Sequence, residues 1–228
     1  MKTKEFNING FVNVAAGGYF DVEIVQADTF RVSISADDFA HILVEKVNDT
    51  LIIRHRGIDC LAIFHSQPQA RIAMPSLAKL TLSGAFKGKM QGFNSTNNLE
   101  LTLSGASHLD AFNISTGSLG VELNGASGLT GDIKANGNAK FEVAGAGKLD
   151  LKGAANNIIL QASGASKIAL DKFPAQNADV EISGASAGTV NLNGKLNADV
   201  SGASSLYWLG TPVMGDIQIS GASKLRRN

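Results

Sequence analysis

Five polar side chains recur along the second half of the chain at intervals of 18 to 20 residues: Glu122, Glu142, Gln161, Glu181 and Asp199. Neighbouring carboxylates can share a cation, or one can raise the pKa of the other, and both effects serve polysaccharide lyases and hydrolases. If Glu122 and Glu142 lie in adjacent coils of a repeat fold, their side chains are about 5 Å apart. A carbohydrate-active enzyme that uses this acidic column is therefore one hypothesis.

The favoured interpretation of the acidic column is a solvated face. Lys140 and Lys148 can temper the repulsion between its carboxylates, and Gln161 interrupts the row where a metal site would need a charged oxygen. The Gly-Gly-x-Gly-x-Asp repeat of calcium-binding β-helices is absent from the sequence. We therefore assign no catalytic, metal-binding or cofactor-binding residue, and we keep Glu122 and Glu142 as candidate surface-binding positions.

A second column carries hydroxyl groups. Each member lies two residues after a glycine, and the candidates for binding are Ser107, Ser127, Ser166 and Ser186. Such a strip could bind glycans or a partner with matching repeats, but serine beside glycine also satisfies backbone groups at a tight corner. Tyr207 falls in an outward column with Asp110 and Asp150, and it is the aromatic candidate for a contact with a sugar or a protein.

Histidine and cysteine indicate no site of their own. The four histidines lack the short spacing of a zinc site: His41, His55, His65 and His108. The single cysteine, Cys60, cannot form an internal disulfide, and we interpret it as a small buried apolar residue rather than a nucleophile.

The elements that would position these columns are repeats of about twenty residues. An apolar-polar-apolar triplet followed by Ser-Gly-Ala-Ser, or a close variant, recurs eight times, with its glycine at Gly84, Gly105, Gly125, Gly145, Gly164, Gly184, Gly202 and Gly221. Triplets such as Phe141-Glu142-Val143 alternate as a half-buried strand does. The alanine after every glycine predicts a tight corner whose interior admits one methyl group.

A second short strand follows each corner, for example Lys148–Lys152. Repeats of this length, with no persistent apolar stripe at helical spacing, predict an all-β solenoid, a parallel β-helix whose coils stack on their neighbours. Residues 80–228 form eight repeats of this solenoid, and residues 1–79 are expected to be a β-rich N-terminal cap continuous with it.

Composition excludes several classes of protein. The formal net charge is zero and only 6% of the 228 residues are aromatic, which argues against binding of nucleic acid. No apolar run approaches the length of a membrane span. The sequence opens without the pattern of a signal peptide, so we expect an extracytoplasmic location (periplasm, outer membrane surface or secreted) only if a leader was replaced by Met1.

The Ser-Gly-Ala-Ser repeats, together with the opening segments Phe6–Val14 and Phe20–Gln26, resemble the bacterial GIN-domain proteins, which are described as heads of autotransporter adhesins. The resemblance covers most of the chain. It implies a right-handed parallel β-helix, exported or attached to the cell surface, without established catalytic residues to carry over.

The resulting hypothesis is a non-enzymatic adhesin or binding scaffold of the bacterial envelope, with glycans or surface proteins as partners. Two alternatives remain open: the carbohydrate-active enzyme, and an envelope protein that assembles with itself. No capping segment follows the eighth repeat, so an open C-terminal end could form a contact between two copies of the chain.

Overall fold

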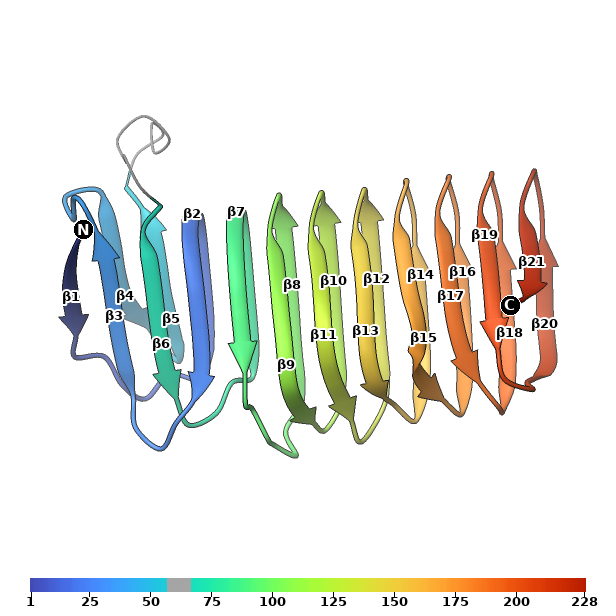
Figure 1. Cartoon of the computed structure of the whole chain (residues 1–228), viewed down its shortest axis with the longest axis horizontal. Helices are drawn as coiled ribbons and strands as arrows, with labels where there is room; N and C mark the ends of the chain where they lie inside the picture. Colours follow the sequence, from blue (N-terminus) through green and yellow to red (C-terminus); the bar gives the residue numbers. More distant parts are fainter. Residues whose placement is uncertain (57–66) are drawn as a thin grey trace.

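The computed structural model describes residues 1–56 and 67–228, which form an elongated rod made of β-strands (Figure 1). The strands of each repeat lie across the rod, and successive coils follow one another along its axis. The prediction of an all-β parallel β-helix is confirmed. Cys60 and His65 lie outside the described residues.

The strands before the repeats are β1 (Lys2–Phe6), β2 (Asn13–Gln26), β3 (Arg31–Ala36), β4 (Ile42–Val47), β5 (Thr50–His55) and β6 (Gln69–Met74). The first repeat forms one long strand, β7 (Lys79–Gln91), which passes through its glycine corner.

From β8 onward each repeat contributes one strand to each of two sheets, which we call the even and the odd sheet. The even sheet contains β8 (Leu99–Gly105), β10 (Leu119–Gly125), β12 (Ala139–Gly145), β14 (Asn157–Ala162), β16 (Asn177–Ile182), β18 (Lys195–Val200) and β20 (Val213–Ile219). The odd sheet contains β9 (His108–Thr116), β11 (Gly128–Ala135), β13 (Lys148–Ala154), β15 (Lys167–Ala175), β17 (Ala187–Leu192), β19 (Ser205–Leu209) and β21 (Lys224–Arg227). Neighbours within each sheet are parallel.

The core lies between the two sheets and consists of stacked apolar rows. Leu101, Val121 and Phe141 are register partners on β8, β10 and β12, and each is at most 3% exposed. The residues that follow them point outward, so each triplet alternates between the buried face and the solvent-facing side of its strand. Because every coil repeats this pattern, the core extends along the rod.

Each glycine corner lies directly on the corner of the coil before it. The Ala165 N–H donates to the Gly145 carbonyl at 2.7 Å, so the backbone ladder continues around the bend. Gly164 has a φ of +83°, and a Cβ added there would lie 2.4 Å from the same carbonyl oxygen. Only glycine fits this backbone conformation and this close approach.

The alanine of the corner does not point inward, so the prediction of a buried methyl was wrong. Ala106, Ala126 and Ala165 are exposed, whereas the residues that follow them are buried. The inside of the corner contains backbone carbonyls, and a hydroxyl can donate to them whereas a methyl cannot.

The N-terminal strands continue both sheets and end each of them with an antiparallel strand. β2 pairs in parallel with β7 from Asn13 to Val25, and its other edge pairs with β5 and β6. On one side β3 runs antiparallel to β6 and β1 antiparallel to β3, while on the other side β4 runs antiparallel to β5. Through β2 and β7 the odd sheet therefore extends to β6. Among the described residues no helix has the length and apolarity that a membrane crossing requires.

Candidate functional site

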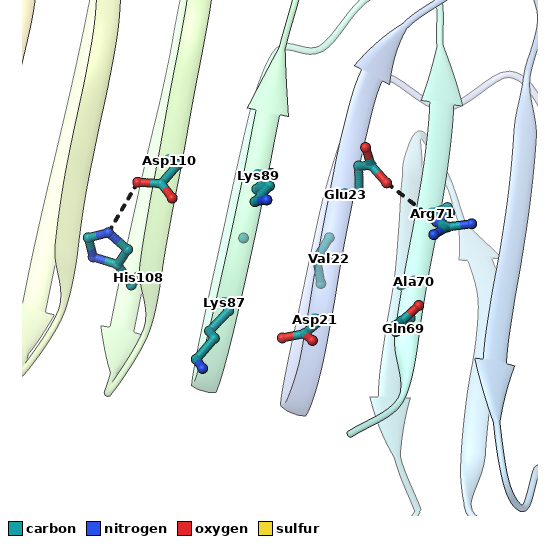
Figure 2. Close-up of a pocket in the computed structure, with 11 residues that line it drawn as sticks. Asp21, Val22, Glu23, Gln69, Ala70, Arg71, Lys87, Lys89, His108 and Asp110 are labelled. Carbon is teal, nitrogen blue, oxygen red and sulfur yellow. Dashed lines mark hydrogen bonds and ion pairs between the residues drawn. The ribbon is translucent and has the colours of Figure 1, made fainter. Parts of the chain in front are cut away.

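A groove of about 560 Å³ crosses the extended odd sheet over β6, β2, β7 and β9 (Figure 2). Two rows of outward side chains cross these strands in register. The first row is Gln69, Asp21, Lys87 and His108, and the second row is Arg71, Glu23, Lys89 and Asp110. The backbone ladder fixes both rows, because residues two apart on one strand share a face.

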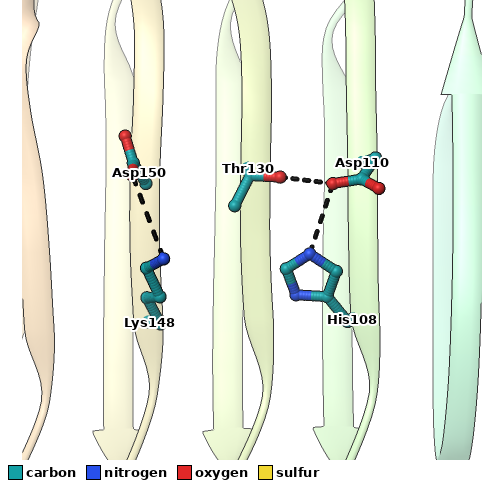
Figure 3. A network of polar contacts seen from close by, with 5 residues as sticks. All are labelled: His108, Asp110, Thr130, Lys148 and Asp150. Carbon is teal, nitrogen blue, oxygen red and sulfur yellow. Dashed lines mark hydrogen bonds and ion pairs between the residues drawn. The ribbon is translucent and has the colours of Figure 1, made fainter.

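Two pairs of these side chains contact each other within the groove. Arg71 Nε lies 3.4 Å from Glu23 Oε2, and His108 Nε2 lies 3.2 Å from Asp110 Oδ1. Figure 3 shows that Asp110 also accepts a short hydrogen bond from the Thr130 hydroxyl on β11. One coil further along, Lys148 lies 4.0 Å from Asp150, so the same two columns continue past the groove.

Two lysines remain available on the central strand of the groove. Lys87 and Lys89 on β7 are exposed, and within the described part of the chain no carboxylate lies within 4.0 Å of either amino group. Their register neighbours on β2 are Asp21 and Glu23. The groove therefore presents two free cations beside carboxylates, which suits a ligand that carries both an anionic group and hydroxyl groups.

Asp21 adds a second indication of an incomplete polar site. Its Oδ1 is shielded from solvent and has no hydrogen-bond partner among the described residues. A buried carboxylate oxygen normally accepts a hydrogen bond, so this atom is an exception among the polar groups of the groove.

Sequence comparison then assigns the chain to a family. The family model described as "Putative auto-transporter adhesin, head GIN domain" matches residues 10–212. The chain belongs to the GIN-domain family. No curated protein matches the sequence closely enough to count as a relative.

Three solved structures share the fold of this GIN domain. A "putative lipid binding protein" of Parabacteroides distasonis has a TM-score of 0.87 at 16% identity, and the match covers 100% of this chain and 96% of that chain. A "putative adhesin" of Parabacteroides merdae has a TM-score of 0.86 at 13% identity, covering 100% and 95%. A "putative adhesin" of P. distasonis has a TM-score of 0.85 at 15% identity, covering 100% and 96%. At these identities the likeness concerns the fold.

The acidic column of the GIN domain lies on the opposite, even sheet. Glu122, Glu142, Gln161 and Glu181 are register partners and line a groove of about 320 Å³, and a further groove of about 250 Å³ continues past Asp199. No group of three or more histidine, cysteine, aspartate or glutamate residues in the described parts of the chain is arranged to hold a metal ion.

Each of these glutamates has a local partner. The Asn124 amide donates to Glu122 at 2.7 Å, Gln161 donates to Glu181 at 3.1 Å, and Lys140 Nζ lies 2.5 Å from Glu142 Oε1. The hydrogen bond from Lys140 to Glu142, and the charge of Glu142, raise the pKa of Lys140 above its ordinary value of 10.5. Glu122 and Glu142 therefore interact with their own neighbours, as residues of a solvated face do.

The serine column is not an accessible strip, which corrects the sequence-based candidates. Ser107, Ser127, Ser166 and Ser186 are each at most 2% exposed. The Ser166 hydroxyl donates to the Ser163 carbonyl at 2.8 Å, and Ser107 and Ser127 make the corresponding bond inside their own corners. These hydroxyls satisfy the backbone at the bend and cannot contact a ligand from solution.

Tyr207 lies on β19 in the odd sheet, in register with Thr189 and Arg226. It is half-buried and is separated from the groove by several coils, so the structure does not bring it together with Lys87 or Lys89. The groove residues could not be identified from the sequence because β2 and β6 lie outside the repeats. A signal was present in the alternating polar pairs, such as Lys87-Gly88-Lys89, but only the fold shows that these pairs are adjacent.

Proposed function

We propose that this GIN domain is a non-enzymatic adhesive scaffold of the bacterial cell surface or periplasm, and that its groove over β6, β2, β7 and β9 binds an acidic glycan. The family match and the adhesins among the structural neighbours support the adhesive role. The observation that carries the choice of ligand is the pair of lysines, Lys87 and Lys89, which have no ion-pair partner among the described residues although they lie in a groove.

An acidic sugar carries the two kinds of chemical group that the groove can bind, an anionic group and hydroxyl groups. Its carboxylate or sulfate would interact with the two ammonium groups, and its hydroxyls would donate to Asp21 and Glu23. A chain of sugars could also follow the row of polar side chains that continues through Asp110 and Thr130. The rigid, in-register sheet holds these groups in place before binding, which lowers the entropic cost of association.

The first test measures binding of oligogalacturonate by calorimetry, with its methyl-esterified form as the uncharged control ligand. We expect the acidic form to bind and the ester to bind much more weakly. Replacement of both lysines (Lys87→Gln with Lys89→Gln) should weaken binding at least about tenfold, since hydrogen bonds to charged groups contribute about 1.5 to 3 kcal/mol each. The matched control is Lys152→Gln with Lys172→Gln, two exposed lysines of the same sheet outside the groove.

Equal binding by the groove variant and the control variant would contradict the assignment of the groove. The same reactions should be monitored for reducing sugar and for unsaturated product, with and without calcium. Product that disappears in the Glu142→Gln variant would instead support the carbohydrate-active enzyme, with chemistry on the even sheet.

A further inference from the structure

The two outer faces of the solenoid carry opposite charge, although the formal net charge of the chain is zero. Strands β8 to β20 of the even sheet contain four glutamates and three aspartates against two lysines. Strands β9 to β21 of the odd sheet contain six lysines and two arginines against four aspartates. None of these side chains is buried.

The register of the coils places some of these like charges side by side in short stripes. On the even sheet Glu122 is the direct neighbour of Glu142, and Glu181 is the direct neighbour of Asp199. On the odd sheet Lys148 pairs with Lys167, and Lys152 pairs with Lys172. Like charges in directly opposed positions of adjacent strands repel each other, and an oppositely charged partner surface would lower this repulsion.

From these stripes we infer a docking surface for a second copy of this chain, in which the acidic even sheet of one copy lies on the basic odd sheet of the next. Each molecule carries both the acidic surface and the basic surface that such a contact requires. Both faces also have the same spacing between strands, about 4.8 Å, because both are ladders of the same coils. A copy displaced sideways can therefore place two neighbouring lysines of its odd sheet against two neighbouring carboxylates of the other copy's even sheet.

Two further features support face-to-face association. Each sheet exposes an apolar side chain within its charged surface, Ile159 on the even sheet and Phe112 on the odd sheet, at 39% and 48% exposure. A net charge of zero also removes the overall repulsion that keeps many proteins apart.

The dimensions of the faces predict a weak and open-ended association. Seven strands about 4.8 Å apart and about 20 Å long give a face of roughly 600 Å², which is below the usual 800 Å² per partner of a stable complex. The even face of one copy contacts the odd face of another, so the contact is heterologous and leaves one free face of each kind. The expected products are short stacks that form at high protein concentration and low salt.

Sedimentation velocity tests this inference at 20 and 500 mM salt over a range of protein concentrations. We expect the sedimentation coefficient of the unmodified chain to rise with concentration at 20 mM salt, and this rise to disappear at 500 mM because ions screen the charges. The even-face variant is Glu122→Lys with Glu181→Lys, and the odd-face variant is Lys152→Glu with Lys172→Glu. Each variant alone should remain a monomer, and circular dichroism should confirm that both are folded.

Mixing the two variants provides the decisive measurement. The odd face of the first and the even face of the second are intact, so an equimolar mixture should associate again at 20 mM salt. Because the two altered faces also receive opposite charges, this association can extend beyond dimers. A monomeric wild-type chain at low salt would overturn the inference. So would association that both variants retain, since the contact would then use another surface, such as the C-terminal coil. Retention on dextran sulfate by a monomeric chain, lost in the odd-face variant, would assign the basic face to a polyanion instead.

Discussion

At the scale of single residues, the pair formed by Lys140 and Glu142 shows how the acidic column is stabilised. The hydrogen bond and the negative charge of Glu142 favour the protonated lysine, and Glu100 adds to the effect on the pKa. A group whose pKa is raised in the folded state contributes stability that is complete below its unfolded value of 10.5 and is lost as the pH rises through the folded value.

This pair predicts a measurable pKa difference. In an NMR titration between pH 9 and 12, Lys140 should lose its proton at a pH above the ordinary lysine value of 10.5. The Glu142→Gln variant should bring the pKa of Lys140 back toward 10.5, because it removes the charge and weakens the hydrogen bond. An unchanged titration of Lys140 in that variant would show that the pair does not persist in solution.

At the scale of the structural elements, the glycine corner leaves no room for a larger residue. Gly164→Ala introduces a Cβ at a φ of +83° and 2.4 Å from the Gly145 carbonyl oxygen. We expect the free energy of unfolding in urea to fall by at least about 2 kcal/mol, since strained backbone and close contact both oppose the folded state. The matched control is Ala165→Ser at the neighbouring exposed position, which should change stability by less than about 0.5 kcal/mol. Similar stability of the two variants would mean that the corner can relax.

The repeated elements were predictable from the sequence because each position occurs eight times. Apolar and polar residues then sort into columns, and the columns give the strand faces and the register of Glu122 with Glu142. The orientation of the side chains at the corner was harder to predict, because alanine follows the glycine in all eight copies and serine follows that alanine in most of them. Composition alone cannot decide whether the methyl or the hydroxyl points inward. The carbonyls inside the bend decide it, and they are visible only in three dimensions.

The groove could not be predicted for a different reason. Its rows combine β6, β2, β7 and β9, and β2 lies between two strands that follow it by dozens of residues in the sequence. Such pairings depend on tertiary packing rather than on a local sequence pattern. Strands outside the repeats also have no equivalent copies in the sequence with which they could be aligned. The sequence therefore does not show that the strands that carry Asp21 and Lys87 are neighbours.

At the scale of the whole molecule, stability should vary along the rod because each coil contacts only its neighbours. Among the described strands, β20 and β21 at one end, like β1 and β4 at the other, have a paired strand on one side only. On β20 the apolar side chains Val213, Met214 and Ile219 are strongly exposed. The opposite end is closed by the antiparallel strands β1, β3 and β4. Opening should therefore begin at the C-terminal coil and proceed toward β7.

Hydrogen exchange measured by mass spectrometry tests this gradient. Amides of β20 and β21 should exchange first and those of β12 and β13 last, because local opening energies range from near zero at frayed ends to the full unfolding free energy in the interior. Leu206→Ala removes a fully buried side chain from β19 and should speed exchange in β18 to β21 while leaving β8 to β11 unchanged. Leu160→Ala, an equally buried change in the middle of the rod, should destabilise coils on both sides of β14. If both variants instead speed exchange equally in all strands, the rod unfolds as one cooperative unit, and stability is not a sum of contributions from neighbouring coils.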